Sequence, residues 1–140
     1  MTQKQITLVK SSWRLLRDLD QTQVGDLFYS KLFLDHPELR RMFPKEMSGQ
    51  NQKLIATLHA MVTRLDDINH LQQELTDLAQ RHVEYGVRPK HYQYVGAALL
   101  WTLESGLGDD WTPATAEAWT TCYQLISGTM IAAAEHTTND

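Results

Sequence analysis

Apolar residues recur every three or four positions along almost the whole chain, and this spacing predicts helices rather than strands. Local signals place several helix starts. Thr2 and Gln5 form a capping box before the first helix, Ser48 can cap the fourth, and Pro113 begins the last. We expect helices over about residues 3–16, 22–34, 37–43, 49–65, 71–85, 91–107 and 113–130. The chain is therefore predicted to be all-α, with about seven helices.

The stretch LQQELTDLAQRHVEYGV contains an ionisable residue where an apolar one would pack more simply. One face of this predicted helix is marked by Leu71, Leu75, Leu78 and Tyr85. His82 falls on the same face, one turn before Gly86, which we expect to end the helix. A single inward histidine is more often a hydrogen-bonded core residue than a metal ligand, so its position alone leaves both interpretations open.

Two further polar side chains are predicted to point inward from other helices. Tyr29 lies one turn after Gly25, where the missing side chain would let another helix backbone approach closely. Gln50 lies one turn before Leu54 and on the same side of its helix, whereas Gln52 points elsewhere. Buried tyrosines commonly bond a single carbonyl, and a glutamine at a helix start is often solvated. Neither residue alone decides a function.

Length and charge exclude several classes of protein. A chain of 140 residues fits one domain with a single core, which we place at about residues 4–135 of 1–140, followed by a frayed tail. The net charge is −4 and the basic residues are scattered, which argues against a nucleic acid or an anionic membrane as partner. The longest apolar run, 97–101, is far shorter than the ~18 residues of a membrane span.

The remaining chemistry points to the cytoplasm and away from common enzyme motifs. The start MTQKQ lacks a signal-peptide core, and the single Cys122 fits a reducing compartment. The histidines at 36, 59, 70, 91 and 136 have no zinc-like spacing, and no Glu-x-x-His pair recurs as a di-iron bundle requires. The chain also lacks a glycine-rich phosphate loop and a G-x-S-x-G turn, so kinase and hydrolase functions are not favoured.

Four segments resemble one known family in their order and spacing. They are VGDLFYSKLFLDHPELRRMF at 24–43, RHVEYGV at 81–87, HYQYVGAALL at 91–100 and EAWTTCY at 117–123. As a set they resemble the bacterial single-domain haemoglobins and the haem domain of flavohaemoglobins, across about residues 4–135. The resemblance implies a globin fold around a haem b group.

The resemblance also assigns roles to individual residues. It makes His82 the proximal ligand of the haem iron, and an inward imidazole is stable there because its lone pair is donated to the metal. Tyr29 and Gln50 match the distal residues that donate hydrogen bonds to O₂. Other residues placed around the haem are Phe43 against its face, Lys53 and Arg81 near the propionates, Leu54 beside the gas ligand, and Leu78, Val87, Tyr92, Val95 and Leu99 on the walls.

These roles imply tight, reversible binding of O₂ at ferrous iron, with NO and CO as other ligands. The implied duties are oxygen transport or scavenging, or nitric oxide detoxification as a dioxygenase that takes electrons from a separate reductase. The alternatives are a haem-based gas sensor, a peroxidase-like protein, and a globin-like structural module without haem. The choice among these duties, the identity of the reductase, the sixth ligand of ferric iron, and the distinction between monomer and weak homodimer stay open.

One position departs from the family. In flavohaemoglobins a Tyr links the proximal His to a Glu on the last helix, which strengthens electron donation by the imidazole. Tyr92 matches that Tyr, but the ungapped alignment places Ala134 at the Glu position. Glu135 is its neighbour, turned about 100° around the helix. The resemblance therefore does not carry the complete relay over, and whether Glu135 replaces the missing Glu stays open.

Overall fold

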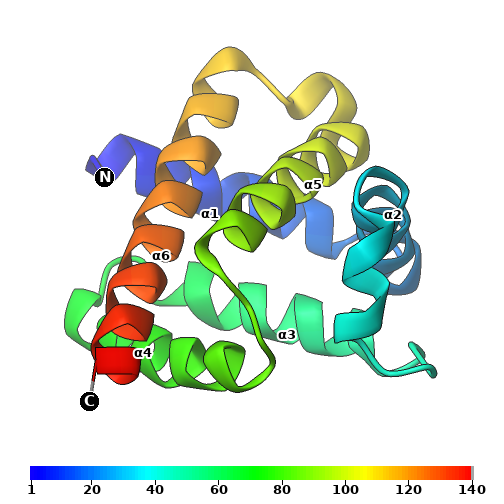
Figure 1. Ribbon diagram of the computed structural model, residues 1–140. Helices are drawn as coiled ribbons and strands as arrows, with labels where there is room; N and C mark the ends of the chain where they lie inside the picture. Colours follow the sequence, from blue (N-terminus) through cyan, green and yellow to red (C-terminus); the bar gives the residue numbers. More distant parts are fainter. Residues whose placement is uncertain (140) are drawn as a thin grey trace.

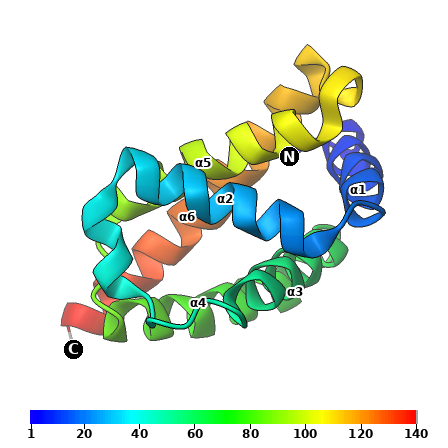
Figure 2. The same cartoon turned by 90° about the vertical axis from the view of Figure 1, so that its right-hand side faces the viewer.

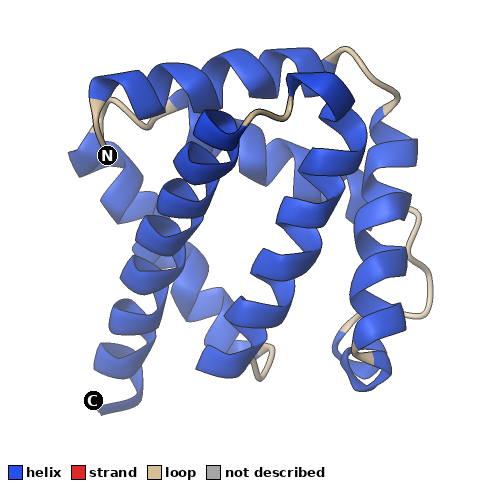
Figure 3. Ribbon diagram, turned by 90° about the horizontal axis from the view of Figure 1, so that it is seen from above, coloured by secondary structure: helices blue, strands red, loops and turns tan. Residues whose placement is uncertain are grey.

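The computed structural model describes residues 1–139, including all of their side chains except those at 68 and 136–139. Within this range the chain is built from helices joined by short loops, without a strand (Figure 3). The elements are α1 (Gln3–Arg17), α2 (Gln21–Asp35), the 3-10 helix η1 (Pro37–Met42), α3 (Gln50–Thr63), α4 (Ile68–Glu84), α5 (Pro89–Leu107), the 3-10 helix η2 (Gly108–Asp110) and α6 (Pro113–Asn139).

The all-α prediction is confirmed for the described residues. The seven expected helices correspond to α1 to α6 and η1, while the short turn η2 was not expected. The Thr2 and Gln5 capping box is present, and the Thr112 hydroxyl accepts the N–H of Thr115 at the start of α6. The tail EHTTND at 135–140 was expected to fray after a last helix ending near Met130, but the backbone stays helical as far as Asn139 in α6, and residue 140 lies outside the described residues.

The predicted cap of α3 is wrong. Ser48 lies one residue before the N-cap position, and its side chain does not cap the helix. Its own N–H donates to the Glu46 carboxylate at 3.2 Å. Gly49 is the N-cap residue and offers no side chain to the first turn. The N–H of Gln50 instead donates to the carbonyl of Met47 at 2.9 Å, so a backbone turn leads directly into the helix.

Both ends of α4 also differ from the prediction. The helix begins at residue 68 rather than 71, because the Asp67 carboxylate accepts the N–H of His70 and caps the first turn. At the other end Tyr85 is the C-cap residue, and its side chain is 65% exposed instead of continuing the buried face. The apolar periodicity could not show this, since it does not distinguish the last helical residue from the cap.

The helices form two layers. Figure 2 shows α2, α5 and α6 above α3 and α4, with α1 closing one end, and Figure 1 shows α5 and α6 crossing over the lower pair. The main packing partners agree with this view, since α6 packs on α4 and α1, and α2 packs on α5 and α3. Side chains such as Val9, Leu75 and Leu103 are almost completely buried between the layers. Each such side chain contributes about 1.5 to 3 kcal/mol of burial free energy.

Gly25 sets the distance between α2 and α3. A Cβ at this position would collide with the side chain of Asn51, whose amide nitrogen donates to the Asp26 carboxylate at 2.8 Å. The helix α3 therefore comes close to α2 at Gly25, and the nearest atoms there belong to the Asn51 side chain. This contact holds the first turn of α3, with Gln50, against the helix that carries Tyr29.

The junction of α4 and α5 fixes His82 in the last turn of α4. Gly86 has a φ of +86°, a left-handed conformation that glycine adopts without a steric penalty, and this confirms the predicted helix end. The N–H of Val87 then donates to the His82 carbonyl at 3.0 Å. Pro89 starts α5, where its missing N–H costs no hydrogen bond.

None of the helices in the described part of the chain combines the length and the apolar character that crossing a bilayer requires.

Candidate functional site

A cavity of about 730 Å³ lies between the two helical layers and receives side chains from α2 through α6 and from η1. All the residues that the sequence placed at the site line it. They are Tyr29, Phe43, Gln50, Lys53, Leu54, Leu78, Arg81, His82, Val87, Tyr92, Val95 and Leu99. The fold thus brings together residues from five separate segments of the chain, and none of the predicted set lies elsewhere.

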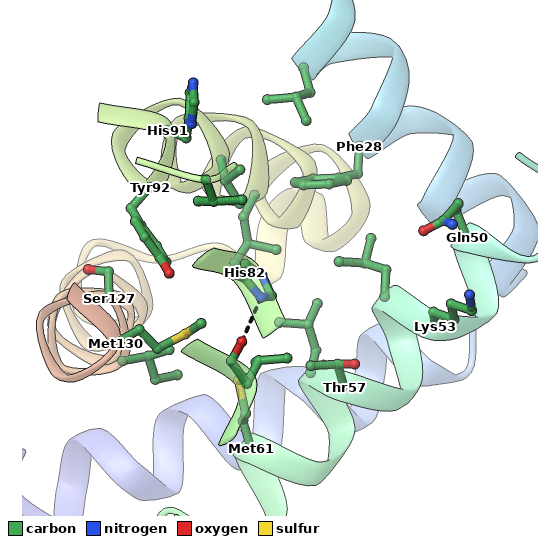
Figure 4. Close-up of a pocket in the computed structure, with 18 of the residues that line it drawn as sticks. Phe28, Gln50, Lys53, Thr57, Met61, His82, His91, Tyr92, Ser127 and Met130 are labelled. Atoms are coloured by element: carbon green, nitrogen blue, oxygen red, sulfur yellow. Dashed lines mark hydrogen bonds between the residues drawn. The ribbon is translucent and has the colours of Figure 1, made fainter. Parts of the chain in front are cut away.

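His82 enters the cavity from the last turn of α4 (Figure 4). Its Nδ1 lies 2.8 Å from the Leu78 carbonyl, the contact drawn as a dashed line in Figure 4. A carbonyl oxygen can only accept, so Nδ1 carries the proton and the neutral ring keeps its lone pair on Nε2. Burial lowers the pKa of His82, and the nearby Arg81 lowers it further, although the Leu78 bond opposes the shift. A neutral imidazole with a fixed tautomer is the form that binds a metal.

Tyr29 approaches the cavity from α2 within a cluster of aromatic rings. Its ring centroid lies 5.0 Å from that of Phe28, 5.9 Å from that of Phe33 and 5.5 Å from that of Phe43. The hydroxyl donates to the main-chain carbonyl of Gln50 at 3.4 Å, which is long for a hydroxyl hydrogen bond. Because this bond is weak, the hydroxyl can turn to another acceptor at little cost.

The ionisation state of Tyr29 is set by its surroundings. Burial raises the pKa of Tyr29 to about 12, because the apolar neighbours disfavour the phenolate. The hydroxyl therefore keeps its proton at neutral pH and remains a hydrogen-bond donor.

The first turns of α3 supply the other polar group on this side. Gln50 is half-buried and lines the cavity, whereas Gln52 is exposed and does not, in agreement with the helical spacing. Leu54 follows one turn later and lines the same wall. Figure 4 shows Gln50 and Lys53 together at the start of α3.

Comparisons with known proteins identify this arrangement. The sequence profile of the globin family matches residues 26–130. The chain belongs to the globin family. This globin is 35% identical over 127 residues to a flavohaemoprotein of Bordetella pertussis, a match that covers 89% of this chain and 31% of the relative. It spans about a third of the length of the flavohaemoproteins it matches.

Solved structures agree with the family assignment. A bacterial globin from Campylobacter jejuni superposes with a TM-score of 0.86 at 25% identity, over 99% of this chain and 100% of the other. A protein from Rhodothermus marinus, described as an engineered carbene transferase and a candidate nitric oxide dioxygenase, superposes with a TM-score of 0.87 at 23% identity, over 99% and 96% of the two chains. The second likeness shows the fold alone.

The α5 and α6 side of the globin cavity holds the residues behind His82. The ring of Tyr92 stacks on the His82 ring at 6.3 Å between centroids, with 18° between their planes. Tyr123, on α6, donates its hydroxyl to the main-chain carbonyl of Tyr92. Its ring fits against α5 because residue 96 is glycine, where a Cβ would lie 3.1 Å from the ring. The side chain of Glu135 is exposed.

Sequence reasoning missed several lining residues. Figure 4 shows Thr57, His91, Ser127 and Met130 among them, from α3, α5 and α6. His91 directly precedes Tyr92 in the HY motif, and its Nδ1 accepts the N–H of Arg88 at 2.9 Å at the start of α5. The motif was a usable signal for His91. The others lie at ordinary helix-packing positions, so only the folded chain shows that they face the cavity.

A haem fits the residues present. The family implies this cofactor, and the cavity offers one imidazole whose Nε2 is free to coordinate. The exposed cations Lys53 and Arg81 lie on the lining, where carboxylates of a ligand could reach them. Within the described residues, no group of three or more His, Cys, Asp or Glu could hold a metal ion by itself. A porphyrin supplies most of the ligands of a haem iron, so a single imidazole such as His82 is enough on the protein side.

Proposed function

We propose that this globin holds haem b in its cavity, with His82 as the proximal ligand, and binds O₂ reversibly on the side of Tyr29 and Gln50. The supporting observation is the hydrogen bond from His82 Nδ1 to the Leu78 carbonyl, because it leaves Nε2 unprotonated within the cavity lining. Globins bind diatomic gases, which is consistent with this proposal, and NO and CO would occupy the same position.

A ferrous haem would supply the position where O₂ binds and the electron density that gives the bound gas negative character. The chain's own donors then act on that charge. Tyr29 turns its hydroxyl from the Gln50 carbonyl toward the gas, and the Gln50 amide donates from the first turn of α3. Hydrogen bonds to charged groups contribute roughly 1.5 to 3 kcal/mol each, so two of them slow O₂ release by several hundredfold or more. These hydrogen bonds stabilise an uncharged ligand such as CO less than they stabilise O₂.

Slow release suits oxygen scavenging or nitric oxide detoxification better than bulk oxygen transport. In the second role, NO and O₂ combine with one electron to give nitrate. That electron would come from a separate reductase in the cytoplasm. The flavohaemoprotein relatives support this choice by similarity. The neutral carbonyl acceptor of His82 supports oxygen holding over peroxidase-like chemistry, because a carboxylate acceptor would strengthen electron donation by the ring.

The test is the absorption spectrum of the purified protein and two histidine variants. We expect an intense haem band in the wild type that disappears in His82→Ala and returns in part with added imidazole. His70→Ala is the matched control, because His70 lies on the same helix with an exposed side chain outside the cavity. Persistence of the unchanged haem spectrum in His82→Ala would overturn the proximal assignment. Stopped-flow mixing of the oxygenated protein with NO, followed by nitrate measurement, then tests the dioxygenase role.

A further inference from the structure

One side chain of η1 binds the backbone that carries Phe43 into the cavity. The Arg40 guanidinium donates from Nη1 to the carbonyls of Phe43 at 3.4 Å and Pro44 at 2.8 Å, and from Nη2 to the carbonyl of Lys45 at 2.9 Å. Three consecutive carbonyls thus accept from a single planar group, whose donors have a fixed geometry. Phe43 and Pro44 line the cavity, whereas the half-buried Arg40 lies outside its lining.

The same guanidinium lies against the aromatic cluster around Tyr29. Its central carbon is 5.7 Å from the centroid of the Phe33 ring, within the range of a cation–π interaction. The Phe33 ring stacks on the Tyr29 ring with 26° between their planes, and its centroid lies 5.3 Å from that of Phe43. Arg40 therefore acts on two of the rings that surround Tyr29, directly on Phe33 and through the main chain on Phe43.

The loop between η1 and α3, residues 43–49, is fixed by different bonds at its two ends. At the α3 end the N–H of Gln50 donates to the carbonyl of Met47 at 2.9 Å, and this turn does not involve the part of the loop in the cavity. At the η1 end the carbonyls of residues 43–45 accept from Arg40. The position of the part that lines the cavity is therefore set mainly by this side chain.

The direction of the Tyr29 hydroxyl depends on the rings that Arg40 holds. The only partner of this hydroxyl among the described residues is the Gln50 carbonyl, and that bond is long at 3.4 Å. The packing of the ring, more than its hydroxyl bond, then orients Tyr29. Because closely packed side chains move together, a shift of Phe33 or Phe43 would turn the hydroxyl away from its direction, and hydrogen bonds weaken steeply with misalignment.

We propose that Arg40 is a positioning residue that determines how strongly this globin prefers O₂ to CO. Its guanidinium holds the backbone at 43–45 and the Phe33 ring, and through them it keeps the Tyr29 hydroxyl directed into the cavity. The inference rests on the proposed function, because Tyr29 discriminates between gases only if they bind beside it. Arg40 itself does not touch the gas.

The first test follows the loop and needs no bound gas. Lysyl endopeptidase cuts after lysine, and Lys45, whose carbonyl accepts an Arg40 bond, is its site within the loop. Arg40→Met keeps a long stem but removes every donor, so cleavage after Lys45 should become about tenfold faster, as expected when a hydrogen bond from a charged group is lost. Cleavage after Lys53, in α3, is the internal control, because a general loss of stability would speed both. Unchanged cleavage after Lys45, or an equal rise at both sites, would overturn the proposal.

The second test compares the two gases. In Arg40→Met the O₂ dissociation rate should rise by roughly three- to tenfold while that of CO changes by less than about twofold, because only bound O₂ carries the charge that the hydroxyl stabilises. The infrared C–O stretching band of the CO form should broaden, since the hydroxyl then takes several orientations. Arg41→Met is the matched control, because Arg41 is the exposed neighbour, and it should leave the rates and the band unchanged. An equal rise of both dissociation rates in Arg40→Met would contradict the proposed preference.

A double variant separates positioning of Tyr29 from other effects of Arg40. If Arg40 acts through the Tyr29 hydroxyl, Arg40→Met should not raise further the O₂ dissociation rate that Tyr29→Phe has already raised. A full additional rise in the Tyr29→Phe protein would show that Arg40 acts by another route and would overturn the proposal. A missing haem band in the wild type would refute the proposed function instead. Cleavage after Lys45 would still report on the Arg40 contacts, so the two failures are distinguishable.

Discussion

The two sides of the cavity offer different chemistry to a bound group. On the α2 and α3 side, Tyr29 and Gln50 carry donors that are loosely held and can turn toward a ligand. On the α4 and α5 side, His82 is fixed by a bond to the carbonyl of its own helix and by the stacked ring of Tyr92. The side with Tyr29 and Gln50 thus carries several hydrogen-bond donors that can change direction. On the other side the His82 ring is held in place, but its neutral carbonyl acceptor adds little to its electron donation. This contrast favours holding O₂ over cleaving its O–O bond.

The largest predicted effect comes from removing the donor on α2. Tyr29→Phe keeps the aromatic packing with Phe28, Phe33 and Phe43 but deletes the hydroxyl. The O₂ dissociation rate should rise by at least about tenfold, because a hydrogen bond to a charged ligand is lost. Flash photolysis or stopped-flow displacement by CO measures this rate. An unchanged rate would remove Tyr29 from the proposed distal site, and an unchanged CO dissociation rate in the variant is the control.

A smaller effect is expected from the donor on α3. Gln50 is the first residue of its helix and only half-buried, so its amide is less restrained than the Tyr29 hydroxyl. Gln50→Leu should raise the O₂ dissociation rate by roughly three- to tenfold, the range for a partly solvated hydrogen bond. Gln52→Leu is the matched control, because Gln52 is exposed and outside the cavity. Equal effects of the two substitutions would contradict the assignment of Gln50.

The sequence predicted the site better than it predicted the helix ends. Periodicity and the family resemblance identified residues that do line the cavity. Residues spaced three or four apart share one face of a helix, so a face that is turned inward brings all of them to the cavity. They could not show that Ser48 bonds elsewhere or that Tyr85 is exposed, since caps depend on one or two local hydrogen bonds. The contact between the rings of Trp13 and Trp119, whose centroids lie 6.2 Å apart, could not be predicted either, because tertiary packing alone brings these distant residues together.

Electron donation by His82 should increase when the glutamate that flavohaemoglobins carry on the last helix is restored. Ala134→Glu places a carboxylate at the aligned position, and we expect it to increase electron donation by His82 through Tyr92. The iron to histidine stretching frequency in resonance Raman spectra should rise slightly, with little change in O₂ dissociation. Glu135→Gln is the control, since the Glu135 side chain is exposed and should leave that frequency unchanged. A shift in Glu135→Gln would instead show that Glu135 already serves the relay.

The last prediction is that the O₂ dissociation rate does not change with pH, and it tests the protonation state of Tyr29. An ordinary tyrosine ionises near pH 10, where it would begin to lose its donor and release O₂ faster. Burial raises the pKa of Tyr29 to about 12, and a raised pKa keeps an acid protonated, so its donor persists beyond the ordinary range. The O₂ dissociation rate should therefore stay constant from about pH 7 to about pH 10.5, checked against circular dichroism to confirm that the fold is intact. A rise centred near pH 10 that is absent in Tyr29→Phe would show that this hydroxyl is solvated, and the contrast between the two sides of the cavity would then rest on Gln50 alone.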